Sequence, residues 1–153
     1  TPLTGDVDIT DTAAEMCAAA IAGHVMIPIF LQVDIESLGG TLPQVTAKSV
    51  ATVSSGGTAF VPLPLRSGGA AAVTTARVAA AGGVAVTAEL ATTTLRHYAQ
   101  TLATAALNQA LWEPTRPPVL EGARCFYVQI GSVTTGSVYF GHFDYLEFTA
   151  AQL

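Results

Sequence analysis

His142 and Asp144 are the residues whose types and spacing come closest to a catalytic or metal-binding arrangement. They stand two positions apart in a segment that alternates like a strand, so both side chains should project from one face and could bind a metal ion or polarise a serine. A metal ion needs three or four converging ligands, and the sequence offers no third ligand close by. His24 or His97 would have to come from elsewhere in the fold. We therefore keep His142 and Asp144 as metal-ligand candidates but expect no metal site, because a polar pair at a subunit contact or beside a loop is the simpler interpretation.

Two further groups of carboxylates were considered as sites. Asp34 and Glu36 should lie on one face of a strand, as a pair for acid–base catalysis would, but a solvated strand end explains them equally well. Asp6, Asp8 and Asp11 have the spacing D-x-D-x-x-D, which is faintly similar to a calcium loop. The central glycine and the bidentate glutamate of such a loop are missing, so we predict no calcium site there.

The sequence contains no G-x-S-x-G nucleophile elbow, no phosphate-binding P-loop, no H-E-x-x-H zinc motif and no paired C-x-x-C motif. Cys17 and Cys125 are single cysteines far apart in the chain, and we expect two buried thiols rather than a disulfide framework. These observations predict a protein that is not an enzyme and that needs no cofactor.

Composition favours a protein that is covered by partners. Of the 153 residues, 50% are hydrophobic and only 11% are charged, with a mean hydropathy of +0.49. Such a composition without a membrane anchor indicates that much of the surface is buried in an assembly. The formal net charge is −5 and Lys48 is the single lysine, so neither nucleic acid nor an anionic membrane surface is an expected partner.

The apolar run at residues 13–33 is long enough to be tested as a membrane or export segment. Glu15, His24 and Pro28 interrupt it, and acidic residues precede it where a signal peptide needs positive charge. We therefore predict no targeting signal and synthesis in the cytoplasm.

The elements that would position these residues are mainly strands. Residues 1–11 should form an extended N-terminal arm that a neighbouring subunit holds, and residues 12–153 a single β-rich domain. The pattern of Thr12 and Glu15 before an alanine-rich stretch predicts a short helix over residues 12–22. Residues 24–36 then alternate, which puts six apolar side chains on one face of a strand: Val25, Ile27, Ile29, Leu31, Val33 and Ile35.

Evenly spaced Gly-Gly pairs separate the next runs of strand length. These runs cover about 44–53, 59–65, 71–79 and 84–91, and their spacing predicts an antiparallel β-sandwich, with a jelly roll as one form. Pro62 and Pro64 remove two hydrogen-bond donors from one side of the second run. That run should be an edge strand or an extended loop.

The last third of the chain should hold a second helix and two strands. Apolar residues at helical spacing predict a helix over about residues 95–111, ended by the prolines that follow Trp112. Strands are expected over 123–130 and 137–148. The last strand carries Tyr139, Phe143 and Tyr145 on one face, which we interpret as core with an intersubunit surface as the alternative.

Taken together, these features resemble a tailed-phage capsid cement (decoration) protein. The resemblance rests on the arm TPLTGDVDITD, the Gly-Gly-punctuated strands VATVSSGGTAFVPLPL and RVAAAGGVAVTAEL, and the aromatic closing strand SVYFGHFDYLEF. It implies a dimer or trimer on the outside of an icosahedral shell, which braces the major capsid protein without catalysis. It carries over no functional residue, and the two expected helices depart from a pure jelly roll.

Interface candidates follow from this assembly hypothesis. They are the arm residues, two arginines suited to intersubunit ion pairs and the aromatic face of the last strand: Thr1, Pro2, Leu3, Arg116, Arg124, Tyr139, Phe143 and Tyr145. The alternatives are a single-jelly-roll coat protein, a tail component, and a β-sandwich module that binds carbohydrate or another ligand. The last alternative would use exposed aromatic residues in a groove, with Trp112 and Tyr98 as the first candidates.

Overall fold

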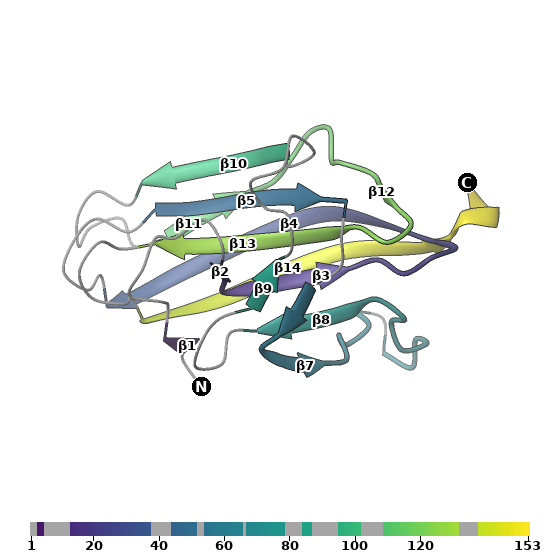
Figure 1. Cartoon of the computed structure of the whole chain (residues 1–153), viewed down its shortest axis with the longest axis horizontal. Helices are drawn as coiled ribbons and strands as arrows, with labels where there is room; N and C mark the ends of the chain where they lie inside the picture. The colour runs from purple at the N-terminus through teal and green to yellow at the C-terminus, as the bar shows by residue number, and fades with distance from the viewer. Residues whose placement is uncertain are drawn as a thin grey trace.

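The computed structural model describes residues 3–4, 13–37, 44–51, 54–65, 67–78, 84–86, 95–101, 109–131 and 138–153. These residues form antiparallel strands and a single-turn 3-10 helix η1 (Ala150–Gln152), which confirms the prediction of a mainly β protein (Figure 1). The strands are β1 (Leu3–Thr4), β2 (Ala13–Ala14), β3 (Met16–Ala19), β4 (His24–Ser37), β5 (Gln44–Val50), β6 (Ser54–Gly56), β7 (Thr58–Phe60), β8 (Thr75–Val78), β9 (Val84–Val86), β10 (Leu95–Thr101), β11 (Gln109–Trp112), β12 (Leu120–Glu121), β13 (Cys125–Gly131) and β14 (Val138–Thr149).

Two large sheets contain most of the strands. One has the order β1-β14-β4-β11, with β12 also paired to β4, and the other has the order β10-β5-β13-β3-β8-β7. A small third sheet is formed by β2, β9 and β6. β4 pairs with β14 in one large sheet, and β5 pairs with β13 in the other. The chain crosses between the sheets from β4 to β5 and again from β13 to β14, so both strands of one pair lead into the strands of the other pair.

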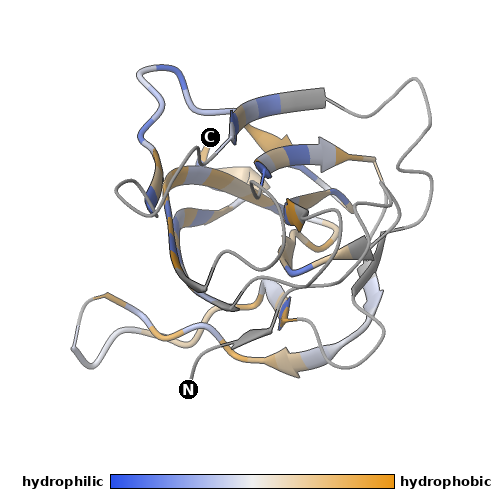
Figure 2. Cartoon of the chain, turned by 90° about the vertical axis from the view of Figure 1, so that its left-hand side faces the viewer, coloured by the Kyte–Doolittle hydropathy of each residue, from blue (hydrophilic) through white to orange (hydrophobic). Residues whose placement is uncertain are grey.

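The main core lies between the two large sheets. Side chains from both sheets form one buried cluster, and aromatic rings stack across it: Trp112 on Phe126 with centroids 5.4 Å apart, and Phe126 on Phe143 at 5.0 Å. Figure 2 shows hydrophobic residues, in orange, on strands at opposite sides of this interior. A second buried cluster, which contains Cys17, Cys125 and Tyr127, lies on the other face of the six-stranded sheet.

The helix predicted over residues 12–22 was wrong, because this segment forms β2 and β3. β3 lies between β13 and β8, and every residue from Ala14 to Ala20 is buried. Glu15 does not cap a helix but accepts a hydrogen bond from the Ile130 backbone N–H at 2.6 Å. Small side chains let other layers approach both faces of the strand. This packing outweighs the helix propensity of alanine, which is worth roughly a few tenths of a kcal/mol per residue.

The second predicted helix was wrong as well. β10 and β11 occupy the two described parts of the segment 95–111, and they pair with β5 and β4 respectively. Gln109 lies opposite Asp34, 75 positions earlier. The partners that stabilise an extended conformation are therefore remote in sequence, and a local pattern does not reveal them.

The long strand β4 was predicted well in extent but contains an irregularity. Phe30 pairs with Asp144 and Pro28 with Tyr145, so Ile29 is an extra residue in β4. This β-bulge reverses the alternation. Leu31 belongs to the core between the sheets, but on the other side of the bulge Met26 belongs to that core and Val25 and Ile27 do not, so the six apolar residues do not share one face as predicted.

Strand β7 is an edge strand of the six-stranded sheet, and Pro62 and Pro64 follow it in an irregular segment. The run 59–65 therefore combines the two predicted forms, an edge strand and an extended loop. Of the arm, Leu3 and Thr4 pair with β14 of the same chain, and the remaining arm residues lie outside the described residues. In the described part of the chain, no helix has the length and apolar character required to cross a membrane.

Candidate functional site

A groove lies between the segment after β7 and the strand β14. Residues 60–65, Ala70 and Ala72 form one wall, and residues 142–147 form the other. The groove encloses about 930 Å³. Its two walls are far apart in sequence and are brought together because β7 lies at the edge of its sheet.

The wall that contains residues 60–65, which we call the outer wall, exposes a row of apolar side chains. The relative exposure is 64% for Val61, 91% for Leu63 and 77% for Leu65. Prolines alternate with them, and proline has no backbone N–H to donate to a further strand. A partner would therefore meet side chains here rather than a sheet edge.

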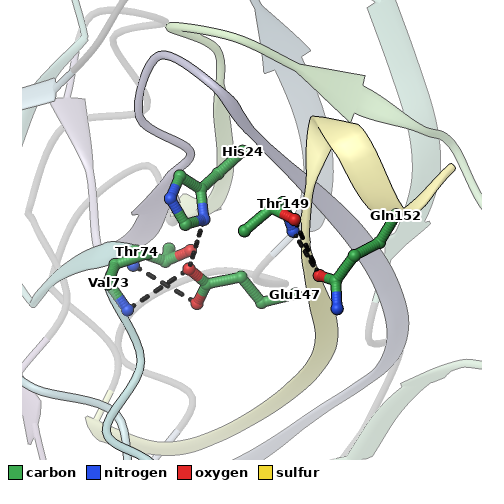
Figure 3. Close-up of polar contacts among 6 residues, drawn as sticks. All are labelled: His24, Val73, Thr74, Glu147, Thr149 and Gln152. Carbon is green, nitrogen blue, oxygen red and sulfur yellow. Dashed lines mark hydrogen bonds and ion pairs between the residues drawn. The ribbon is translucent and has the colours of Figure 1, made fainter.

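Glu147, in β14, binds the end of the segment that follows β7, at residues 73 and 74 (Figure 3). Its two carboxylate oxygens accept hydrogen bonds from the backbone N–H groups of Val73, at 3.2 Å, and Thr74, at 3.3 Å. His24 Nδ1 lies 3.4 Å from Glu147 Oε1. We call Glu147 and these three contacts the clasp, because they join the groove-forming segment to β14 and to the start of β4.

An internal cavity of about 190 Å³ opens beside the groove. It lies between the two large sheets, at the end where β8 and β7 form the edge. Its walls are mostly apolar, with Met16, Val78, Phe126, Val128, Phe143 and Tyr145 among the lining residues. Five residues line both the cavity and the groove: Phe60, Pro62, His142, Phe143 and Tyr145.

His142 and Asp144 lie on the rim of the groove. The His142 Nε2 atom is 2.9 Å from Asp144 Oδ1, which confirms that the two side chains share a face of the strand. The His142 side chain is 60% exposed and contacts the ring of Phe30 edge-on, with centroids 5.6 Å apart. Within the described ranges, no group of three or more His, Cys, Asp and Glu side chains is arranged to hold a metal ion.

Of the other carboxylate pair, Asp34 and Glu36, only the Asp34 side chain lies in the described structure. Asp34 accepts hydrogen bonds from two amides, Gln32 Nε2 at 2.7 Å and Gln109 Nε2 at 2.8 Å. The first bond lies within β4, and the second joins β4 to its neighbour β11. Asp34 thus has a structural role, and the side chain of Glu36 lies outside the described residues.

The aromatic face of β14 points into the molecule. Tyr139 is fully buried, and Phe143 and Tyr145 pack against the core between the sheets. This agrees with the interpretation of the face as core. Burial raises the pKa of Tyr139 far above its usual value, with a smaller contribution from the nearby Glu15 carboxylate. The pKa of Tyr145 rises to about 12, for which burial is the largest cause and Glu147 the second.

Of the remaining interface candidates, the described residues Leu3, Arg116 and Arg124 do not form one patch. Arg116 and Arg124 are exposed in irregular segments on either side of β12, whereas Leu3 is in β1, well apart from β12 in Figure 1. Thr1 and Pro2 lie outside the described residues.

Trp112 and Tyr98 do not form an exposed aromatic platform. Trp112 is only 9% exposed and stacks on Phe126, so its ring cannot meet a sugar unless the core opens. Tyr98 is partly buried, and its hydroxyl donates a hydrogen bond to Gln100 Oε1. Cys17 and Cys125 are both buried thiols, as predicted.

Sequence reasoning missed the groove and the clasp. The alternation V-P-L-P-L at residues 61–65 is a sequence signal for the groove. Its prolines predict the backbone conformation, whereas its apolar side chains indicate an exposed surface. Nothing in the local sequence connects Glu147 with Val73 and Thr74. No protein-family model, curated protein or solved structure matches this chain.

Proposed function

We propose that this chain is a non-catalytic structural subunit of a viral particle, which binds copies of itself and the major capsid protein on the outer surface of the shell. The observation that carries the proposal is the row of exposed apolar residues Val61, Leu63 and Leu65 along the groove. An exposed apolar surface of this kind marks a protein–protein contact. The low share of charged residues in the sequence supports the same conclusion.

The topology adds support from the fold. We infer that the two large sheets form a β-sandwich of jelly-roll type, because the paired strands β4/β14 continue as β5/β13 in the facing sheet. A two-stranded ribbon wound in this way characterises jelly rolls, which are common in viral capsid proteins and also occur in lectins. The burial of Trp112 removes the aromatic residue that we expected a carbohydrate-binding relative of this architecture to use.

The charges near the groove also fit a contact surface better than a catalytic centre. His142 is paired with Asp144, and the Glu147 carboxylate is occupied by two backbone N–H groups. Neither arrangement places a base beside a nucleophilic side chain. A partner with an apolar ridge could cover the row without burying an unpaired charge of the clasp.

Self-association is tested by the solution mass of the purified chain, measured by light scattering after size exclusion over a range of concentrations. We expect a dimer or trimer, and we expect Leu63→Asp to shift the equilibrium toward monomer. Burying a leucine side chain contributes roughly 1.5–3 kcal/mol, so this variant should weaken association by about tenfold or more. Leu153→Asp is the matched control, because Leu153 is 74% exposed but is not part of the groove.

The capsid contact needs a separate measurement. Shells assembled from the major capsid protein of the same genome would be sedimented with the wild-type chain and with both variants. We expect the wild type and Leu153→Asp to co-sediment and Leu63→Asp to remain in solution. A wild-type chain that stays monomeric and does not bind shells would overturn the proposal.

A further inference from the structure

The cavity beside the groove has the dimensions and the chemistry of a ligand site. It encloses about 190 Å³ between the inner faces of the two large sheets. An apolar cavity of about 150 Å³ is large enough to bind benzene. A single aromatic ring, or an alkyl chain of similar size, therefore fits within it.

The lining determines which chemical class is accepted. Phe126 and Phe143 supply aromatic faces, and Met16, Val78 and Val128 supply aliphatic surface. The lining also includes Arg77, whose Nη1 donates to the Gly56 carbonyl oxygen at 2.7 Å and whose buried Nε has no hydrogen-bond partner within the described residues. An apolar ligand gains by leaving water for such walls, whereas a cationic ligand would lose its hydration beside the positive charge of Arg77.

A ligand can reach the cavity from the groove. Phe60 and Pro62 line both spaces from one side, and His142 and Tyr145 line both from the other. Phe60 is itself partly exposed and belongs to the edge strand β7. The entrance thus lies at the edge of the six-stranded sheet rather than through the middle of a sheet.

Met16 gives the cavity an adjustable wall. Its side chain extends from β3 to β14, where it passes close to Gly141, and both residues line the cavity. Methionine is unbranched and adapts its shape to irregular neighbours. Small rotations of this side chain can change the space that a ligand occupies.

We propose that this cavity is a binding site for a small, uncharged apolar ligand, namely a single aromatic ring or a short alkyl chain. The proposal concerns a site between the sheets and does not depend on the assembly function, which uses the outer wall of the groove. Toluene is a suitable probe of the site. Benzylammonium is the matched control ligand, because it keeps the ring and carries a positive charge that Arg77 in the lining would repel.

The chain offers an internal reporter, because it contains two methionines, Met16 and Met26. Both belong to the core between the sheets, but only Met16 lines the cavity. The experiment is a toluene titration of the full chain labelled with ¹³C in the methionine methyl groups, followed by NMR. The two resonances are assigned with Met16→Leu and Met26→Leu.

We expect a saturable shift of the Met16 resonance and no change at Met26, and we expect benzylammonium to shift neither. Val78→Phe, which fills the cavity, should abolish the Met16 shift. If that variant does not fold, Gly141→Ala serves instead, because it pushes the end of Met16 toward the cavity and should weaken toluene binding by about fivefold or more. Equal shifts of both methionines, or no shift at the solubility limit of toluene, would overturn the proposal.

Discussion

The end of the Met16 side chain occupies the space that a side chain at position 141 would need. Both Sδ and Cε of Met16 lie 2.5 Å from the position of a Cβ atom built on Gly141. Carbon and sulfur atoms do not approach each other so closely without a clash, so the two residues are mutually dependent. A glycine in the middle of β14 allows a long side chain from the facing sheet to reach the backbone of that strand.

Gly141→Ala should therefore destabilise the protein only modestly, by about 1 kcal/mol, because the flexible end of Met16 can turn toward the adjacent cavity. Met16→Ala should cost roughly 2–3 kcal/mol, since it removes a side chain from the core. The double variant should be more stable than the sum of the two effects implies, by about 0.5–1 kcal/mol. Urea unfolding of the four proteins measures this coupling, and strict additivity would contradict the contact.

Glu147→Gln should loosen the segment that forms the outer wall of the groove. The amide keeps one neutral oxygen acceptor, so one of the two backbone N–H groups of Val73 and Thr74 loses its acceptor, at a cost of roughly 1–2 kcal/mol. Amide hydrogen exchange at residues 73 and 74 should become faster. Glu121→Gln is the control, because Glu121 is exposed at a position outside the clasp. Unchanged exchange in Glu147→Gln would show that the clasp does not restrain the segment.

His97 should make the protein sensitive to mild acid. Burial lowers the pKa of its imidazole below the ordinary value of 6.5. Its Nε2 is 2.7 Å from the Ser49 hydroxyl oxygen, and its ring stacks on Phe126. The unfolded chain takes up a proton at a higher pH than the folded chain does, so this contribution to stability is present above pH 6.5 and is lost as the pH falls through the unfolded pKa toward the folded one.

The measurement is the free energy of unfolding of the wild type and of His97→Asn between pH 8 and pH 5. The free energy of unfolding of the wild type, relative to that of the variant, should decrease as the pH falls. A constant difference across this range would mean that His97 has the same pKa in both states.

Tyr139→Phe should leave the stability unchanged or raise it slightly, although Tyr139 is fully buried in the core. Within the described part of the chain, its hydroxyl oxygen has no hydrogen-bond partner, and burial of such a group costs about 1–3 kcal/mol. Phenylalanine keeps the ring and removes the unsatisfied hydroxyl. Thermal unfolding compares the two proteins. A loss of more than about 1 kcal/mol would indicate a partner outside the described residues.

Much of the architecture was available from local patterns in the sequence. The alternation over 24–36, the apolar closing strand and the regular glycine pairs predicted a mainly β, antiparallel fold, and β4, β13 and β14 are close to their expected positions. Of the two alternatives for the run 59–65, Ala59 and Phe60 belong to an edge strand, and Pro62 and Pro64 lie in the irregular segment that follows it. The spacing of His142 and Asp144 was enough to predict that they lie together, because alternate residues of a strand share a face.

The alanine-rich segment shows where local reasoning ends. Alanine favours a helix only slightly, and this preference is small beside the free energy of a strand that is paired on both edges and covered on both faces. β3 gains those neighbours from β8 and β13, and residues 16 and 128 pair although they are more than a hundred positions apart. The sequence by itself determined the alternation, the turns and the scarcity of charge. Only the tertiary structure decided that Met16 contacts Gly141 and that Glu147 binds residues 73 and 74. It also decided that a groove lies beside β14 and a cavity between the sheets. Each of these features depends on contacts between strands that sequence order does not reveal.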